Sequence, residues 1–281
     1  MIFSLKTWLV VACLLLAALT AALAQADEPE KITVALSQPG RPGMLKASLM
    51  SGSIKVSGYK GREVVVSYSS REGKVKDKPP VEAEGLRRIS NNNIGLEIRE
   101  ENNTVTVKNA GLPLAVDLQI MVPNDFSLKL KTMNGGSINV EDVNGELEID
   151  NLTGNINLRN VAGSASASTL NGNIVAAFNK VTDNMPMAFS SLNGTIDVTL
   201  PAAAKFNAKL KTDNGDIFTD FDMAMDKGGK TEVTTNKLRN SDASAGTRLY
   251  IDKWLYGKIN GGGPDLLLKN FNGNIYIRKS K

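Results

Sequence analysis

The chain of 281 residues contains no histidine, and its only cysteine is Cys13. Without histidine it cannot form a Ser-His-Asp triad, a Cys-His pair or a histidine-ligated zinc or haem site. An enzyme built from these residues would have to use carboxylates, lysine, tyrosine or a metal held by oxygen ligands. We expect no cofactor and no metal site, because the acidic residues match no known ligand spacing.

Aromatic residues are also scarce, at 5% of the chain, and the charge is nearly balanced, with 33 Lys and Arg against 29 Asp and Glu. The net charge of +4 is too small to indicate a nucleic-acid partner. Hydrophobic residues make up 42% and are spread along the chain. This composition argues against a disordered protein and is typical of one or two domains with a sizeable core.

Residues 1–26 have the pattern of a secretory signal peptide. Lys6 precedes an apolar run, and small residues then lead to two Ala-x-Ala sites that end at Ala24 and Ala26. Two alternatives remain. One is an uncleaved anchor helix, because the apolar run could just span a bilayer with some thinning, and the other is a lipoprotein signal at Cys13. Cleavage would leave an exported chain, periplasmic, cell-surface or secreted, with no cysteine and no transmembrane span.

Beyond this segment, Asn-Gly and related pairs recur every nine or ten residues, or at about twice that step. Asn and Gly tolerate positive φ angles and therefore make tight turns. After each glycine, apolar residues alternate with polar ones, as at Ile156 and Leu158, which places them on one face of a short strand. The pairs that we interpret as structural turns are Asn134-Gly135, Asn144-Gly145, Asn171-Gly172, Asn193-Gly194, Asn214-Gly215 and Asn272-Gly273.

This repeat predicts an all-β protein, a β-solenoid in which stacked coils of short strands cover one another's apolar faces. The alternative is an antiparallel β-sandwich of hairpins, because Asn-Gly is also a good hairpin turn. We favour the solenoid because the same strand pattern follows each turn without a distinct partner strand at hairpin distance. Asparagines at equivalent corners should then form a hydrogen-bonded ladder, and the core should contain Ile138, Ile156, Ile174, Ile196, Ile217 and Ile275.

A longer repeat relates Phe126–Gly135 to Phe206–Gly215, 80 residues further on. Both segments read F-x-x-K-L-K-T-x-N-G, and we interpret them as an internal duplication. Strand alternation sends Leu130 and Leu210 towards the core and the lysines towards solvent. The sequence therefore predicts either a solubilising outer face or a basic stripe for an anionic ligand, formed by Lys129, Lys131, Lys209, Lys211 and Lys269.

After the signal segment we divide the chain into an N-terminal β region, residues 27–111, and a repeat-rich domain, residues 112–281. Two segments depart from the repeat. Residues 71–112 are charged and polar, and we interpret them as an irregular insertion with a hairpin around Glu101–Asn103. Residues 220–248 are rich in Asp, Gly, Asn and Ser, which predicts a second excursion without strands.

Several motifs, together with their order, resemble the bacterial putative-adhesin domain family, whose function is unknown. The motifs are the G-x-I-x-V series, L-K-T-x-N-G-D-I at Leu210–Ile217, the strand end Leu200-Pro201, and Tyr256–Pro264 followed by Asn272–Ile275. The resemblance covers roughly Leu112 to Arg278 and, more weakly, Ile32 to Tyr68. It implies an exported, solenoid-like all-β domain and brings no catalytic residues.

Three groups of side chains are candidates for a site. Five aspartates between Asp213 and Asp226 offer the hard oxygen ligands that Ca²⁺ prefers, but we favour a solvated loop there. The carboxylate pairs Glu141/Asp142 and Glu146/Glu148 could serve as the acid and base of a glycosidase. Aromatic side chains alternate at Tyr250, Trp254 and Tyr256, and they form either a glycan surface or one packed face of a strand.

These observations together predict a non-catalytic structural or binding module, adhesin-like, of the bacterial cell envelope. Its expected partner is an envelope or extracellular polysaccharide, or another envelope protein. The alternative is a carboxylate-dependent polysaccharide lyase or hydrolase on the same β-helix scaffold. A polysaccharide assay separates the two, because turnover indicates an enzyme and retention without turnover indicates a binding module.

Overall fold

The computed structural model describes residues 30–70, 95–109, 115–226, 231–238 and 246–281, which form strands β1 to β22 with their turns and loops. Lys31–Lys281 make one compact unit. In the described part of the chain, no helix combines the length and the apolar character needed to cross a bilayer. The expected signal segment and the expected boundary between residues 111 and 112 lie outside the described residues.

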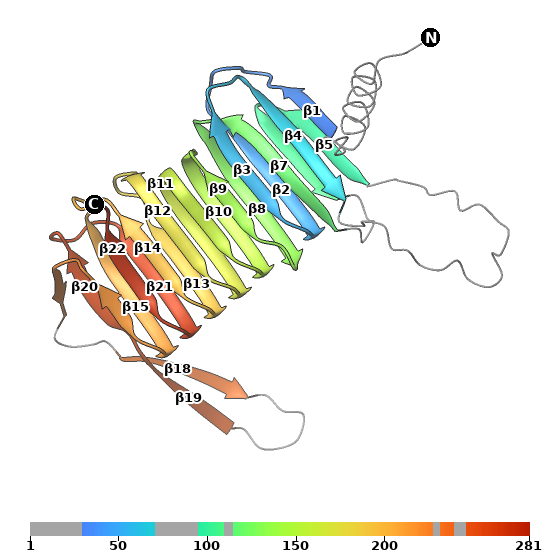
Figure 1. The fold of residues 1–281 in the computed structure, drawn as a ribbon. Helices are drawn as coiled ribbons and strands as arrows, with labels where there is room; N and C mark the ends of the chain where they lie inside the picture. Colours follow the sequence, from blue (N-terminus) through green and yellow to red (C-terminus); the bar gives the residue numbers. More distant parts are fainter. Residues whose placement is uncertain (1–29, 71–94, 110–114, 227–230, 239–245) are drawn as a thin grey trace, which may run out of the picture. The chain divides into compact units, whose positions relative to one another are not determined.

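The unit is a solenoid of two-stranded coils, whose strands form two sheets with the core between them (Figure 1). Sheet 1 contains, in stacking order, β6 (Thr104–Asn109), β2 (Gly43–Ser51), β8 (Phe126–Asn134), β10 (Asn144–Thr153), the second half of β11 (Ile156–Asn171), β13 (Met187–Asn193), β21 (Asp265–Asn272), β15 (Phe206–Asn214) and β20 (Leu255–Ile259). Sheet 2 contains β7 (Val116–Pro123), β3 (Ile54–Tyr59), β9 (Ile138–Glu141), the first half of β11, β12 (Ile174–Val181), β14 (Ile196–Leu200), β22 (Ile275–Lys279) and β16 (Ile217–Thr219).

The pairing confirms the solenoid and excludes the sandwich of hairpins. β8 and β9 flank the turn at Asn134, yet β8 pairs in parallel with β2 and β10, and β9 pairs in parallel with β3 and β11. Asn144 of β10 is in register with Ala162 of β11, so this coil takes 18 residues, while the coil from Leu128 to Leu147 takes 19 and that from Ser166 to Ala188 takes 22. The nine-residue step in the sequence is therefore half a coil, and successive turns lie on opposite edges of the stack.

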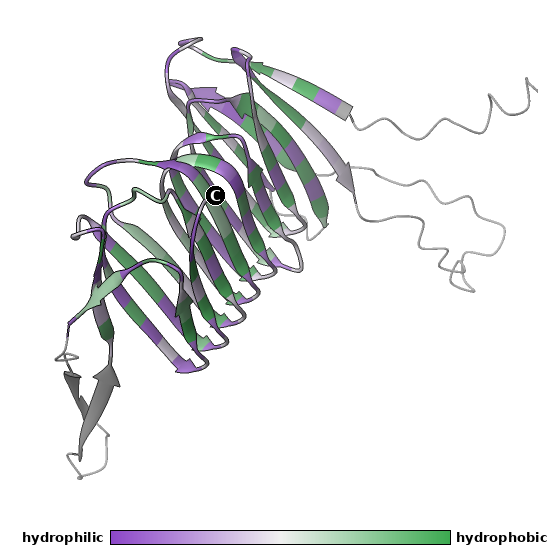
Figure 2. Ribbon diagram, turned by 60° about the vertical axis from the view of Figure 1, so that its left-hand side comes forward, coloured by the Kyte–Doolittle hydropathy of each residue, from purple (hydrophilic) through white to green (hydrophobic). Residues whose placement is uncertain are grey.

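Strand alternation fills the core, and Figure 2 shows apolar and polar residues alternating along the strands. Five of the six isoleucines that were expected to point inward have no exposed surface. Ile217 is the exception and is only partly buried. The reason is its place in the stack, because β16 pairs with β22 on one side and no described strand covers its other side. The isoleucines with no exposed surface are Ile138, Ile156, Ile174, Ile196 and Ile275.

The order of coils in the stack differs from their order in the sequence. The coil β2–β3 lies between β6–β7 and β8–β9, and the last coil, β21–β22, lies between β13–β14 and β15–β16. The second and third strands of the chain, β2 and β3, and its last two, β21 and β22, are thus held inside parallel sheets. The two copies of the 80-residue repeat form β8 and β15, nine residues each, and each lies next to one of these inserted coils.

Antiparallel strands cover both sheets at one end of the solenoid and sheet 1 at the other. At one end β5 (Leu96–Glu101) pairs with β6, and β4 (Glu63–Ser70) pairs with β7 and with β1 (Glu30–Ala35). At the other end β20 pairs with β15 and with β17 (Met223–Met225). Such caps satisfy the backbone groups that a parallel sheet edge would leave open.

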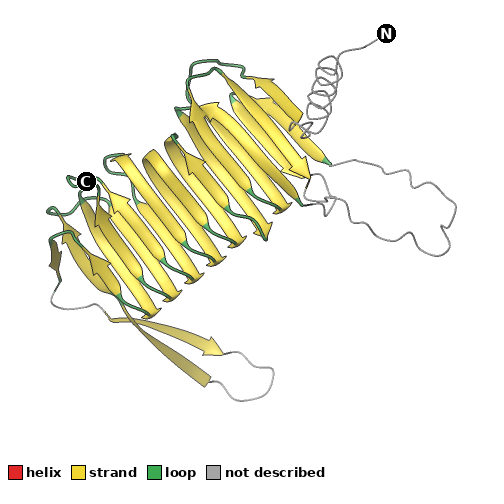
Figure 3. Ribbon diagram, in the orientation of Figure 1, coloured by secondary structure: helices red, strands yellow, loops and turns green. Residues whose placement is uncertain are grey.

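Both irregular segments contain strands in their described residues. The hairpin around Glu101–Asn103 is confirmed as β5–β6. The expectation of an excursion without strands at 220–248 is wrong, because it contains β17 and much of the antiparallel pair β18 (Thr231–Leu238) and β19 (Gly246–Lys253) (Figure 3). No Asn-Gly pair borders these strands, whereas Asn-Gly pairs stand at the ends of β8, β11, β13, β15 and β21.

Hydrogen-bonded side chains line the turns where the strands of sheet 1 end. The amide of Asn193 donates to Asn171 at 2.7 Å, Asn272 donates to Asn193 at 2.7 Å, and Asn214 donates to Asn272 at 2.8 Å. A second row lies two residues earlier and points inward, and its members donate to a carbonyl of the neighbouring turn. These residues are Thr132, Asn151, Thr169, Ser191, Asn270 and Thr212.

Glycines stack at the same edge because a side chain there would strike the next coil. A Cβ added to Gly154 would lie 2.1 Å from the carbonyl oxygen of Gly136, and one on Gly172 would lie 2.1 Å from that of Gly154. The residue of the first turn that joins this column is Gly136, while Gly135 faces open space. Gly145 lies inside β10 at the opposite edge, in register with Gly163 of β11.

Candidate functional site

The repeated lysines lie on the outer face of sheet 1, as strand alternation requires. Leu130 and Leu210 are buried between them. Lys129, Lys131 and Lys269 are exposed, and Lys209 is half-buried. The expectation that Lys211 faces solvent is wrong, because only 8% of it is exposed and Trp254 lies beside it.

The lysines form two separate groups and no continuous stripe. Lys131 on β8 and Lys269 on β21 occupy the same position across the sheet, but β10, β11 and β13 lie between them. The residues at that position on these three strands are Asp150, Ser168 and Ser190. With strands about 4.8 Å apart, the two groups are about 19 Å from each other.

In the first group, Lys129 is already engaged with a carboxylate. Its Nζ lies 2.7 Å from Oε1 of Glu148, and both side chains are about half exposed. An ion pair this exposed contributes little to stability, but it lowers the charge that Lys129 offers to a ligand. Lys131 is also exposed, and it makes no ion pair with any described residue.

The second group combines two features that are separate in the sequence, the lysines and the aromatic side chains. Nζ of Lys209 lies 4.4 Å from the ring centre of Trp254 and 5.7 Å from that of Tyr256. Nζ of Lys211 lies 5.7 Å from the Trp254 ring and 3.5 Å from Oδ1 of Asp213. Contacts of an ammonium group with an aromatic face are attractive and restrict the lysine.

This arrangement follows from the pairing of β20 with β15. The antiparallel register places Tyr256 opposite Lys209, and Trp254 lies beside Lys209 and Lys211. Trp254 is 7% exposed, so its ring supports the lysines and is not itself an open stacking surface for a sugar. Its indole Nε1 is buried and donates no hydrogen bond to any described residue. We call Lys209, Lys211, Lys269, Trp254 and Tyr256 the lysine–tryptophan cluster.

The candidate acid–base pairs are not brought together. Glu141 is on β9 of sheet 2, whereas Glu146 and Glu148 are on β10 of sheet 1, so the two pairs face opposite sides of the solenoid. Glu141 forms ion pairs with Lys55 and Arg159, each at 3.7 Å, and Glu148 pairs with Lys129. Carboxylates that are open to solvent and paired with cations lack the enclosed apolar surroundings of a catalytic acid.

The aspartates between Asp213 and Asp226 have separate roles where the structure describes them. Asp213 pairs with Lys211, and Asp220 accepts a hydrogen bond from the backbone N–H of Lys279 at 2.7 Å. Within the described ranges, no three side chains of the acidic, cysteine or histidine type are grouped to hold a metal ion.

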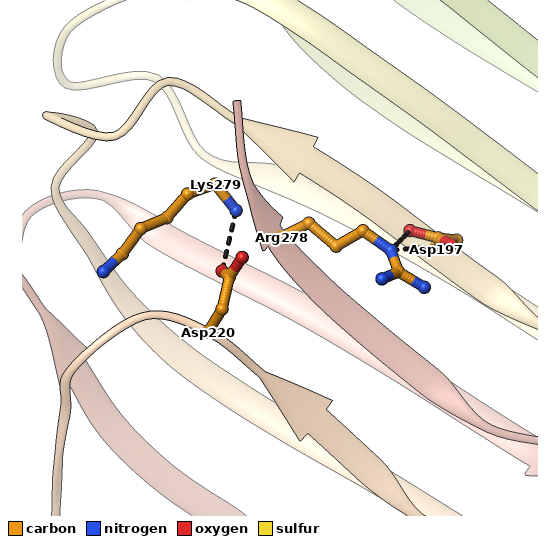
Figure 4. Close-up of polar contacts among 4 residues, drawn as sticks. All are labelled: Asp197, Asp220, Arg278 and Lys279. Atoms are coloured by element: carbon orange, nitrogen blue, oxygen red, sulfur yellow. Dashed lines mark hydrogen bonds and ion pairs between the residues drawn. The ribbon is translucent and has the colours of Figure 1, made fainter. Parts of the chain in front are cut away.

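Sheet 2 carries an aromatic pair that the sequence analysis missed. The rings of Phe218 and Tyr276 stack at 5.1 Å with an interplanar angle of 12°, and Phe218 is 47% exposed. Arg278 lies over the ring of Tyr276. The Nε of Arg278 donates a hydrogen bond to Asp197 at 2.9 Å (Figure 4). This hydrogen bond raises the pKa of Arg278. Phe218 and Tyr276 lie far apart in the sequence, and only the register of β16 with β22 makes them neighbours.

The family model of Toastrack DUF4097 matches residues 30–247. The chain belongs to this family. β20, β21 and β22, and with them part of the lysine–tryptophan cluster, lie beyond the matched residues. No curated protein matches the chain.

Three solved structures are similar to it. A putative cell adhesion protein from Clostridium sporogenes shares 11% identity, covering 90% of this chain and 100% of its own, with a TM-score of 0.45. A putative adhesin from Bacteroides fragilis shares 10%, covering 91% and 98%, with a TM-score of 0.36. A putative lipid binding protein from Parabacteroides distasonis shares 10%, covering 91% and 98%, with a TM-score of 0.27. These likenesses are too distant to bear on the function of this chain.

Proposed function

We propose that this chain is an exported, non-catalytic binding module of the bacterial cell envelope that holds an anionic polysaccharide. The observation that carries the proposal is the lysine–tryptophan cluster, in which three lysines gather beside two aromatic side chains at one end of a flat, regular sheet. Lys269 is exposed and Lys209 is half-buried against aromatic rings, and cations held in this way suit a chain of sugars that carry carboxylate or phosphate groups.

Such contacts are individually weak, because exposed ion pairs are screened by water and salt. Retention of a long polymer therefore depends on several lysines acting at once and on several sugar units in contact with the sheet. The ring of Trp254 holds Lys209 and Lys211 near their places, so less side-chain freedom is lost when the ligand binds.

The binding test measures retention on immobilised polygalacturonate, with the neutral glucan dextran as the reference matrix. The variant Lys209→Gln/Lys269→Gln removes two cations of the cluster and leaves the buried Lys211 in place. The matched control is Lys129→Gln/Lys131→Gln, which removes the same charge from the first lysine group. We expect retention to fall several-fold in the cluster variant, to change less in the control, and to fade between low and physiological salt.

Equal retention of wild type and both variants at every salt concentration contradicts the proposal, as does the absence of any retention on the anionic matrix. Release of shorter or unsaturated sugar chains would instead identify a lyase or hydrolase.

Export has its own test. Residues 1–26 carry the signal pattern, and we expect N-terminal sequencing of the exported protein to begin at Gln25 or Asp27. A mature N-terminus at a lipidated Cys13 would show a lipoprotein signal, and retention of Lys6 in the mature protein would show an anchor helix.

A further inference from the structure

A row of large apolar side chains is exposed along the edge where the strands of sheet 1 end. Each is the residue directly before the first position of a turn, on six successive coils of the stack, and each is between 40% and 50% exposed. Figure 1 shows the ends of these strands along one edge of the solenoid. We call this row the apolar ridge, and its members are Met50, Met133, Leu152, Leu170, Leu192 and Phe271.

The register makes the ridge continuous. Thr169 pairs with Ser191 and Asn171 pairs with Asn193, so Leu170 of β11 lies beside Leu192 of β13. The same register joins β2, β8, β10, β11, β13 and β21 in turn. At a strand spacing of about 4.8 Å, six neighbours span about 24 Å. The ridge ends at the next coil, where β15 has Asp213 at the equivalent position.

The fold does not require these side chains to be apolar. Along most of each strand the inward residues are apolar. At this edge, however, the residue that directly precedes each ridge residue is buried and polar in five of the six coils, as at Thr169 and Asn270. Those polar residues form the inner hydrogen-bond row, whereas the ridge residues point away from the core. An apolar residue at an outward position is normal once, but six in line mark an interaction surface.

The flanks of the ridge are polar, and the charged residues among them are Lys131, Asp150 and Lys269. On the turn side are uncharged side chains, Ser51, Asn134, Thr153, Asn171, Asn193 and Asn272. On the sheet side, two residues before the ridge, are Ser48, Lys131, Asp150, Ser168, Ser190 and Lys269. Lys131 therefore lies beside the second residue of the ridge, next to Asp150, and Lys269 lies beside its last residue.

We propose that the apolar ridge inserts into the surface of an anionic lipid leaflet and holds the solenoid edge-on against a membrane. A line of side chains along one edge can enter a planar surface together, at the depth where headgroups meet acyl chains. The amide and hydroxyl groups beside the ridge then lie among headgroups, and Lys131 and Lys269 lie near lipid phosphates.

The area and shape of the ridge favour a leaflet over a second copy of the chain. A stable protein interface buries about 800 Å² on each partner, whereas one row of half-exposed side chains offers only a few hundred. The ridge is also a projecting edge, so it offers no concave site for a separate apolar ligand. This surface is distinct from the lysine–tryptophan cluster, although Lys269 belongs to the cluster and also lies beside the last residue of the ridge.

The first test is sedimentation with vesicles of phosphatidylethanolamine and phosphatidylglycerol, with phosphatidylcholine vesicles as the uncharged reference. The ridge variant is Leu152→Ser/Leu170→Ser/Leu192→Ser, which keeps every lysine. The matched control is Met121→Ser/Val175→Ser, which removes apolar side chains of 42% and 43% exposure from sheet 2. We expect the ridge variant to lose at least about tenfold in partitioning to anionic vesicles, and the control to keep the wild-type value.

A second measurement does not depend on any membrane affinity of residues 1–26, which all these proteins share. In a Cys13→Ser background, an environment-sensitive fluorophore is attached at Leu170→Cys or, as the control on the opposite edge, at the exposed Asn179→Cys. Brominated lipids should quench the probe at position 170 and not the probe at 179. Equal quenching at both positions, or none at 170, overturns the proposal even if the triple variant fails to fold.

Sedimentation velocity without lipid identifies the competing occupant. If the wild type is a dimer and the ridge variant a monomer of unchanged melting temperature, the ridge is a contact between two copies and the proposal is wrong. A monomeric wild type whose ridge probe is quenched supports the leaflet.

Discussion

Replacing Gly154 by alanine would press a methyl group into the neighbouring coil. The added Cβ would lie 2.1 Å from the carbonyl oxygen of Gly136 and 2.8 Å from its carbon, whereas Cβ contacts essentially never fall below 3.0 Å. The obstructing atoms are backbone in a paired coil, so they cannot rotate away as a side chain would. The φ angle of Gly154 is +137°, a conformation that residues with a Cβ rarely adopt.

Two costs add at this position. Holding alanine at this φ costs about 1–3 kcal/mol, and forcing two packed coils apart costs about 1–3 kcal/mol more. The amide of Asn151 donates to the Gly136 carbonyl at 2.9 Å, so a displaced coil also strains this buried hydrogen bond. We expect Gly154→Ala to lower the free energy of unfolding by about 2–6 kcal/mol.

Gly135 provides the matched control in the preceding turn of the same edge. Its φ is +64°, and an added Cβ would meet nothing within 4 Å, so alanine there carries only the backbone cost of about 1–2 kcal/mol. Urea unfolding followed by far-ultraviolet circular dichroism measures both variants against the wild type. If Gly135→Ala is as destabilising as Gly154→Ala, or if Gly154→Ala stays within about 0.5 kcal/mol of the wild type, close stacking of the turns does not explain the glycine column.

Two further predictions concern the core and an exposed carboxylate. Ile196→Ala should lower the free energy of unfolding by about 2–5 kcal/mol, because Ile196 has no exposed surface. Ile217→Ala should lower it clearly less, because Ile217 lies partly buried at the end of the stack. Equal losses in urea unfolding would contradict this prediction. Glu100 accepts hydrogen bonds from the backbone N–H and the hydroxyl of Ser37, and these bonds lower the pKa of Glu100 from 4.5. The ionised carboxylate therefore stabilises the fold above the unfolded-state pKa, and this stabilisation is lost as the pH falls through the lower folded-state pKa. The melting temperature of Glu100→Gln should therefore lie below that of the wild type at neutral pH, and the two should converge as the pH falls below about 4.5. A difference in melting temperature that stays constant with pH would refute the role of this carboxylate.

Local sequence determined the strands, the turns and the class of fold. Alternating residues such as Ile156 and Leu158 can bury one face only in a strand, and Asn-Gly pairs allow the chain to reverse within two or three residues. Because these two signals repeat at half the 18-residue coil, they predicted stacked coils and an asparagine ladder before any contact was known. They also predicted the outward direction of most repeated lysines.

The tertiary structure alone decided which coils are neighbours. Apolar strands of similar length are interchangeable as far as local pattern goes, so the sequence does not show that β2 inserts before β8 or β21 before β15. That order splits the lysines into two groups and aligns six apolar residues into one ridge. It also brings Trp254 over Lys211, so that Lys211 is buried. The physical reason is that strand and turn formation depend on nearest neighbours in the chain, whereas stacking depends on backbone pairing between segments far apart in sequence. Binding surfaces on a solenoid are made by the stack, and so they appear only when the order of the coils is known.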